Sequence, residues 1–203
     1  SEGFFYNMLE EWSRISQSDS TIGLLSPIIR DRTYHNVSVP RAIRDGQVVK
    51  LPEPVTQFPV AQVMPISSGI LTTVEIFDRC GGIDDALFID WVDFQLDFNL
   101  MAAGFETYYS NVAFIEHSIG TKQVHYFLNK KIYPTSHPLF REYYFTRNAL
   151  VVGRQFSTLI PGLMKFVWRS IAIKYIFAFY EKNTLKRLVQ LTKGIHDAKK
   201  YQR

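Results

Sequence analysis

The stretch from Gly81 to Gly120 constrains this chain more than any other. It places five aspartates within fourteen positions and surrounds them with large apolar residues. An ionised carboxylate beside apolar surface is costly unless it is paired, hydrogen-bonded or bound to a metal. We therefore interpret the stretch as the wall of an active site. The five residues are Asp84, Asp85, Asp90, Asp93 and Asp97.

Hydrophobic periodicity predicts helices that alternate with strands. A strand is expected over residues 21–30, ending near Pro27, and two strand-like runs over residues 105–117. Strands that alternate with helices and lead into a helical tail predict an α/β fold. Helices are expected at residues 3–16, 73–79, 90–103 and 140–156, and over much of 159–202.

The composition is that of a globular domain, with 46% hydrophobic and 21% charged residues, and 203 residues suffice for one good core. The single cysteine, Cys80, excludes an internal disulfide and a cysteine-based metal cage. No run of about twenty apolar residues occurs, so no transmembrane helix is expected.

Asp90 and Asp93 lie at the start of the helix expected over residues 90–103. Carboxylates are favoured at a helix N-terminus, so both could simply cap a buried helix. The alternative is that one of them is a general base, which needs rigid placement and a tuned environment. The neighbouring aromatic residues Phe88, Trp91 and Phe94 would supply both.

His117 follows a predicted strand and precedes Ser118, Ile119 and Gly120. It could be a structural histidine, or a ligand for a metal or phosphate, because strand ends face clefts in α/β sheets. The pair Ser68-Gly69 is a tight turn by default, and a functional turn there would let the backbone approach a ligand closely.

An arginine and tyrosine cluster falls on the helix expected over residues 140–156. It is either a solvated face or a site for an anionic group, because guanidinium forks match phosphate oxygens. The cluster comprises Arg141, Tyr143, Tyr144, Arg147 and Asn148.

The tail from Leu163 to Arg203 is basic, with Glu181 and Asp197 as its only acids. It is either an ordinary helix pair packed on the body or a basic amphipathic surface for an anionic membrane. Nucleic-acid binding is not expected, because no recognised binding motif accompanies the charge.

Taken in order, these motifs resemble the family 2 inverting glycosyltransferases, in the rhamnosyltransferase-like branch that builds bacterial surface polysaccharides. The resemblance implies an α/β chain that forms the C-terminal portion of a GT-A (nucleotide-diphospho-sugar transferase) fold. Residues 1–156 would be the acceptor-side part of the catalytic domain, and residues 157–203 a basic helical tail. The matching positions are Ser68-Gly69, the run from Gly81 to Asp93, Gly104, His117 with Gly120, the run from Arg141 to Asn148, and the run from Lys193 to Ala198.

The resemblance also implies roles for single residues. Asp93 would be the catalytic base that deprotonates the acceptor hydroxyl. His117 would lie near the divalent cation, Mg²⁺ or Mn²⁺, and the diphosphate. The substrate-binding residues would be Ser68, Gly69, Asp90, Trp91, Arg141 and Arg147.

The implied reaction moves a sugar, with rhamnose as one candidate, from a nucleotide-sugar donor to a saccharide or lipid-linked saccharide acceptor. The implied location is cytoplasmic and peripheral, at the inner face of the bacterial membrane, where oligomers could form. The nucleotide-binding half and its Asp-x-Asp motif are expected upstream of Ser1, so this chain alone is expected to be inactive.

Two positions depart from the family pattern. Gln95 stands where an acidic residue is usual, and Asn99 where an arginine is usual. These departures leave open a second hypothesis, a catalytically inactive binding or scaffold module with the same fold. A third hypothesis, an unrelated metal-dependent hydrolase built on the aspartates, is weaker.

Overall fold

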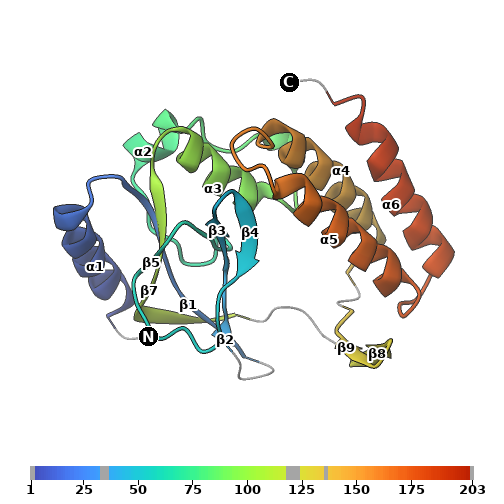
Figure 1. The fold of residues 1–203 in the computed structure, drawn as a ribbon, viewed down its shortest axis with the longest axis horizontal. Helices are drawn as coiled ribbons and strands as arrows, with labels where there is room; N and C mark the ends of the chain where they lie inside the picture. The colour runs from blue at the N-terminus through green and yellow to red at the C-terminus, as the bar shows by residue number, and fades with distance from the viewer. Residues whose placement is uncertain (1–2, 33–36, 118–123, 135–136, 202–203) are drawn as a thin grey trace. The chain divides into compact units, whose positions relative to one another are not determined.

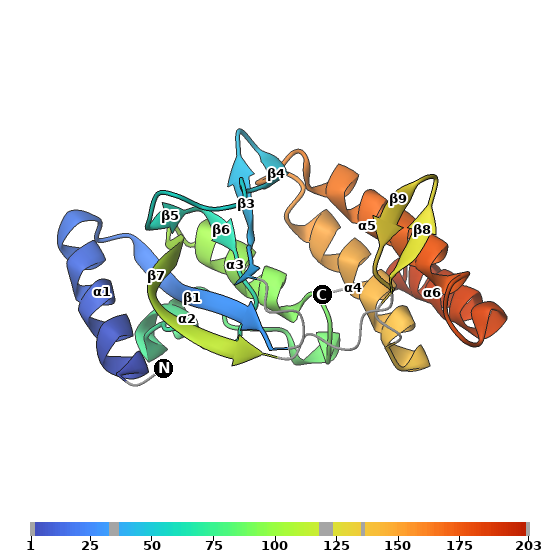
Figure 2. The ribbon, with the colours of Figure 1, turned by 90° about the horizontal axis from the view of Figure 1, so that it is seen from below.

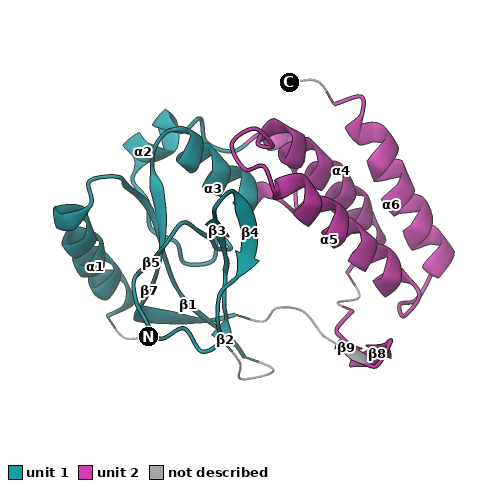
Figure 3. Ribbon diagram, viewed as in Figure 1, with its two compact units in different colours: residues 1–83, 93–119 teal, residues 84–92, 120–203 magenta. Residues whose placement is uncertain are grey.

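The chain folds into two compact units, each of which is described separately below (Figure 3). Unit 1 comprises residues 1–83 and 93–119, and unit 2 comprises residues 84–92 and 120–203. The structure is a computed structural model, which describes residues 3–32, 37–117, 124–134 and 137–201.

A mixed sheet with strand order β2-β1-β7-β5 forms the centre of unit 1 (Figure 1). β1 (Ile22–Asp31) and β7 (Glu106–His117) run parallel to each other. The short strands β2 (Val37–Ser38) and β5 (Val60–Ala61) pair antiparallel with β1 and β7 respectively. A parallel pair needs a long crossover between its strands, and here that crossover carries the helices of unit 1 that follow β1.

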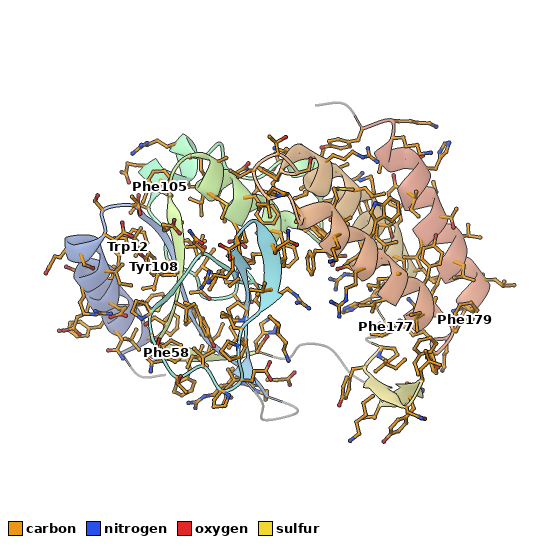
Figure 4. The ribbon with its side chains drawn as sticks, in the orientation of Figure 1. Trp12, Phe58, Phe105, Tyr108, Phe177 and Phe179 are labelled. Carbon is orange, nitrogen blue, oxygen red and sulfur yellow. The ribbon has the colours of Figure 1, made fainter. Side chains whose placement is uncertain are left out.

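Helix α1 (Phe4–Ser18) packs on the sheet through Met8 and Ile15. Figure 4 shows Trp12 and Tyr108 in the layer between this helix and the sheet, where both join the same apolar cluster. The Tyr108 hydroxyl also donates a hydrogen bond of 2.5 Å to the Asp19 carboxylate.

Two further helices belong to a second apolar cluster of unit 1. Helix α2 (Val74–Arg79) is capped by the Thr73 hydroxyl, which accepts a hydrogen bond from the Ile76 backbone N–H. Helix α3 (Val92–Ala102) packs on β1 through Leu96 and Leu100. A small antiparallel sheet completes the unit, formed by β3 (Arg41–Arg44), β4 (Gln47–Lys50) and β6 (Val63–Met64).

Unit 2 is built on three helices that pack against one another: α4 (Leu139–Gln155), α5 (Leu163–Ala178) and α6 (Thr184–Ala198). A Cβ placed on Gly194 would lie 2.5 Å from the Tyr143 carbonyl oxygen, so α6 crosses α4 at a distance that only glycine permits. The hairpin of β8 (His125–Phe127) and β9 (Lys130–Ile132) and the 3-10 turn η1 (Asp85–Leu87) complete the unit (Figure 2).

A buried ion network joins the helices of unit 2. Arg187 Nη1 lies 2.7 Å from Glu142 Oε1 and 2.9 Å from Glu181 Oε2, and Lys174 Nζ lies 3.3 Å from Glu142 Oε2. Charges this deeply buried require partners, so each of these contacts fixes where one helix lies on another.

The mixed α/β class expected from the sequence is confirmed, and three details differ. β1 continues past Pro27 because a register shift between Ser26 and Ile28 accommodates the proline. Asp90 and Trp91 are not helical, since both have positive φ. Residues 140–156 were placed with the body, whereas α4 packs with α5 and α6 in unit 2.

Within unit 2, α5 and α6 bury Leu163, Val167, Ile171 and Leu191. Other large apolar residues of the two helices stay exposed: Trp168, Ile173, Leu185 and Val189. None of the helices in the described part of the chain has the length and apolar character needed to span a bilayer.

Candidate functional site

Asp93 lies in the first turn of α3, at the helix end where a negative charge is favoured. Its carboxylate is partly exposed, and Oδ1 accepts a hydrogen bond of 3.2 Å from the Ser67 backbone N–H. The turn at Ser67 and the start of α3 are thereby joined. Unit 1 thus places Asp93 beside the Ser68-Gly69 turn, and both belong to the residues singled out from the sequence.

The Ser68-Gly69 turn needs its glycine. Gly69 has φ of 72°, and a Cβ at this position would lie 3.2 Å from Ile115 Cδ1 and 3.3 Å from Phe4 Cζ. The left-handed backbone disfavours larger residues, and a Cβ would also require Ile115 and Phe4 to shift slightly. The turn is therefore packed tightly on β7 and α1, which holds the backbone beside Asp93 in one position.

Asp97 lies one helical turn beyond Asp93 and is buried, with 4% of its surface exposed. Burial raises the pKa of its carboxyl well above the usual range, and the negative charge of Asp93 raises it further. Asp97 Oδ2 has no hydrogen-bond partner among the described residues. The protonated form of Asp97 is thus favoured by its surroundings.

Ser67, Asp93 and Asp97 line a narrow hollow of unit 1, which has about 140 Å³ of space and is partly open to solvent. It is too narrow to admit a water molecule, so it is not a sugar pocket by itself. Its lining residues are Leu24, Pro65, Ile66, Ser67, Ile70, Asp93, Leu96 and Asp97.

His117 ends β7 and lies opposite Asp31, the last residue of β1, in the parallel register. Its Nδ1 is buried and has no hydrogen-bond partner among the described residues. The Gly120 that follows it in the motif lies outside the described residues, as do Ser118 and Ile119.

A divalent cation is not accounted for by this histidine. Mg²⁺ and Mn²⁺ prefer several oxygen ligands. Within the described ranges, no group of three or more His, Cys, Asp or Glu side chains is placed to hold a metal ion. The described residues therefore do not form the expected cation site on their own.

The loop of residues 84–91, which lies in unit 2, is held by Asn148 of α4. The Asn148 side chain is fully buried, and its Nδ2 donates to three carbonyl oxygens. The distances are 2.8 Å to Leu87, 2.8 Å to Ile89 and 3.0 Å to Asp90. The loop needs such support because Phe88, Asp90 and Trp91 all have positive φ, a strained conformation for residues other than glycine.

Asp90 forms a two-pronged ion pair with Arg141 of the same unit. Arg141 Nε lies 3.0 Å from Oδ2 and Nη2 lies 2.5 Å from Oδ1. This hydrogen-bonded carboxylate raises the pKa of Arg141. His137 lies beside the pair, with Nδ1 3.3 Å from Arg141 Nη1. Burial, and after it the charge of Arg141, lower the pKa of His137 to about 4.

Arg147 and Trp91 also have structural partners within unit 2. Arg147 Nη2 donates to the Ala86 carbonyl at 2.5 Å, and its guanidinium lies 4.8 Å from the centre of the Tyr144 ring. The Trp91 ring is buried and lies 5.9 Å from that of Phe166. The predicted substrate-binding residues of unit 2 therefore all help to hold the 84–91 loop.

The two departures from the family pattern are both buried in α3. Asn99 Nδ2 donates a hydrogen bond of 2.8 Å to the Gly82 carbonyl oxygen, and Gln95 is fully buried. Asn99 thus ties the end of the Gly81-Gly82 turn to the helix. An arginine at this position would have to place its charge in the same buried space.

No protein-family model and no curated protein matches the sequence.

Proposed function

We propose that this chain provides the acceptor side of an inverting glycosyltransferase, with a GT-A type of fold and Asp93 as the catalytic base. The donor is a nucleotide-diphosphate sugar, with rhamnose as one candidate, and the acceptor is a saccharide or a lipid-linked saccharide. The contact between the Ser67 backbone and Asp93 carries the proposal, because it brings together two motifs that lie far apart in the sequence.

Asp93 has the properties that the reaction requires of its base. It is partly exposed, fixed by one backbone hydrogen bond and placed at a helix N-terminus. As the acceptor oxygen bonds to the anomeric carbon, Asp93 takes the hydroxyl proton and the bond to the diphosphate oxygen breaks. The raised pKa of buried Asp97 favours its neutral form, so Asp93 has a neighbour that tends to carry no charge.

The remaining roles belong to the same proposal. Ser68 and Gly69 would line the junction of donor sugar and acceptor, and their rigid turn suits that task. Arg141 and Arg147 would bind a phosphate group only by sharing or leaving their present partners, Asp90 and the Ala86 carbonyl. Asp90 and Trp91 would shape the acceptor pocket from a loop that Asn148 holds rigid.

The test is a transfer assay with the full-length protein, a panel of nucleotide sugars and a divalent cation. Asp93→Asn should abolish transfer and leave binding of the nucleotide sugar unchanged, because only the proton acceptor is lost. Asp85→Asn is the matched control, since Asp85 is an exposed aspartate of the same stretch. Undiminished turnover by Asp93→Asn would exclude Asp93 as the base.

The second candidate is a binding or scaffold module with the same fold and no transferase activity. Asn99 favours it, because a buried amide bonded to Gly82 stands where the family pattern has an arginine. The same panel separates the two candidates: the module would bind a saccharide and transfer nothing from any donor.

A further inference from the structure

The β8–β9 hairpin of unit 2 exposes apolar side chains at its tip. Its two-residue turn has positive φ at both Leu128 and Asn129, which is typical of a tight hairpin. The Leu128 side chain is 82% exposed and the Tyr126 ring 61%. Single exposed hydrophobic residues are common on protein surfaces, whereas a contiguous exposed group indicates a binding surface. The residues around the hairpin tip therefore have to be considered.

The neighbour of the hairpin is the C-terminal end of α5. The Tyr180 hydroxyl donates a hydrogen bond of 3.0 Å to the Tyr126 carbonyl, and the ring centres of His125 and Tyr180 are 5.2 Å apart. Phe179, beside Tyr180, is 67% exposed and lies at the end of α5 near the hairpin (Figures 1 and 4). The exposed apolar groups of the hairpin and of α5 thus adjoin.

The exposed face of α5 carries further apolar and basic side chains of unit 2. Trp168 and Ile173 are among its exposed residues, and Lys165 and Arg169 lie exposed between and beside them. Residues three and four apart share one face of a helix, so Lys165, Trp168 and Arg169 are neighbours. We define the hairpin–helix surface as Tyr126, Leu128, Lys131, Lys165, Trp168, Arg169, Ile173 and Phe179.

The charge of this surface has one sign. Residues 124–134 contain no acid, and the only acid from Leu163 to Lys182 is Glu181. Glu181 is buried and paired with Arg187, so it adds no exposed negative charge. By contrast, the exposed apolar residues of α1 in unit 1, such as Phe5 and Leu9, have the exposed acid Glu10 beside them.

We propose that the hairpin–helix surface binds the interface of an anionic lipid bilayer. Aromatic rings favour the interface between headgroups and acyl chains, and exposed lysines and arginines are attracted to anionic headgroups. The combination of exposed Trp, Phe, Leu and Tyr with basic residues and without acids matches that environment. Leu128 and Phe179 would enter the bilayer, and Lys165, Arg169 and Lys131 would contact headgroups.

This surface differs from the apolar pattern of the tail read from the sequence. Much of that pattern is buried between helices, including Leu163, Val167 and Ile171, and is not available to lipid. Ile173, Phe179, Lys165 and Arg169 of the tail pattern remain exposed, and Trp168 and the hairpin, which the pattern did not include, add to them. The inference does not depend on glycosyl transfer by unit 1.

The experiment is co-sedimentation of the full chain with phosphatidylcholine vesicles and with vesicles that also contain phosphatidylglycerol. Binding is expected only to the anionic vesicles, with a vesicle-induced blue shift of fluorescence that Trp168→Phe removes. The double variant Leu128→Ser/Phe179→Ser should bind about tenfold more weakly. The double variant Lys165→Gln/Arg169→Gln should also weaken vesicle binding, and the loss should be larger at low salt than at about 1 M salt.

The matched control is Phe5→Ser/Leu9→Ser, which removes equally exposed apolar groups from α1 and should bind vesicles as the wild type does. Circular dichroism establishes that each variant is folded, and the exposure of the replaced side chains makes loss of folding unexpected. If a double variant unfolds, the vesicle-induced fluorescence shift, compared between the wild type and Trp168→Phe, still tests whether α5 contacts the lipid. Equal binding to both vesicle types, equal binding by the Leu128/Phe179 variant, or self-association in place of vesicle binding would overturn the proposal.

Discussion

Replacing Asn148 with alanine should destabilise unit 2 more than any surface substitution, because this one side chain closes the 84–91 loop. Its amide nitrogen has two N–H groups, which it shares among the carbonyls of Leu87, Ile89 and Asp90. Its amide oxygen accepts a hydrogen bond of 2.9 Å from Arg147 Nε. The variant would remove all of these bonds, and the Leu87 carbonyl would keep the Ile89 N–H as a partner, at 2.7 Å.

The size of the effect follows from these contacts. A hydrogen bond contributes about 1 kcal/mol net, and a buried group left without a partner costs about 1–3 kcal/mol. Solvent entering the exposed parts of the loop would satisfy some of the carbonyls. The expected loss of unfolding free energy for Asn148→Ala is therefore about 3 kcal/mol. Asn99→Ala in unit 1 removes a single bond, to Gly82, and should cost about 1 kcal/mol.

Urea unfolding measures both variants, and in proteins that keep a single tryptophan the two units have separate fluorescence reporters. Trp91 lies in the loop and packs on Phe145 and Phe166, so its fluorescence follows unit 2. Trp12 lies in unit 1. Asn148→Asp tests the chemistry further, because it places an oxygen where the three carbonyls need a donor, and it should be at least as destabilising as alanine. An Asn148→Ala effect no larger than that of Asn99→Ala would refute the assignment of Asn148 as the residue that closes the loop.

Two other substitutions test the buried carboxyl and the helix crossing. The folded-state pKa of Asp97 is raised, so the folded protein binds the extra proton and loses stability as pH rises from about 4 toward that pKa. Asp97→Asn should remove this dependence of stability on pH. The variant should be more stable than the wild type at pH 7 but not at pH 3, which thermal unfolding across that range would measure. Gly194→Ala forces a Cβ against the Tyr143 carbonyl oxygen and should cost about 2 kcal/mol, with Lys186→Ala on the exposed side of α6 as a neutral control.

The sequence predicted the helices and the long strands well, because their apolar periodicity reflects burial. Helix α2, for example, is expected over residues 73–79 and spans Val74–Arg79, with Thr73 as its cap and two glycines after Cys80. The extension of β1 past Pro27 was not predicted, because the register shift that accommodates it depends on the pairing with β7. The β8–β9 hairpin was missed as well, since its turn residues, Leu128 and Asn129, include no glycine to mark it.

The candidate site was predictable only in part. Asp93 and the Ser68-Gly69 turn do lie together, as a resemblance of ordered motifs implies. The sequence did single out Asn148 as part of the arginine and tyrosine cluster, but it did not predict that Asn148 holds the 84–91 loop. The three partners of this buried amide are backbone carbonyls of a loop far away in the sequence. Such bonds do not depend on the side chains of the loop, so the sequence pattern cannot indicate them. Asp97 was given no role for a similar reason, because its effect depends on burial beside Asp93.

The contrast between the two units bears on the choice between transferase and scaffold. In unit 2, Arg141, Arg147 and Asn148 all have partners in the 84–91 loop, so folding alone accounts for these three residues. Asp93 differs, because its carboxylate is partly exposed and accepts one backbone hydrogen bond from Ser67. A scaffold would need that carboxylate only as a weak helix cap, and a polar uncharged residue would serve the same purpose. The carboxyl of Asp97, buried one turn below with a raised pKa, has no use in a scaffold either, because its burial opposes ionisation and so costs stability as the pH rises. The pair is explained if Asp93 takes a proton from a bound hydroxyl, and this explanation favours the transferase.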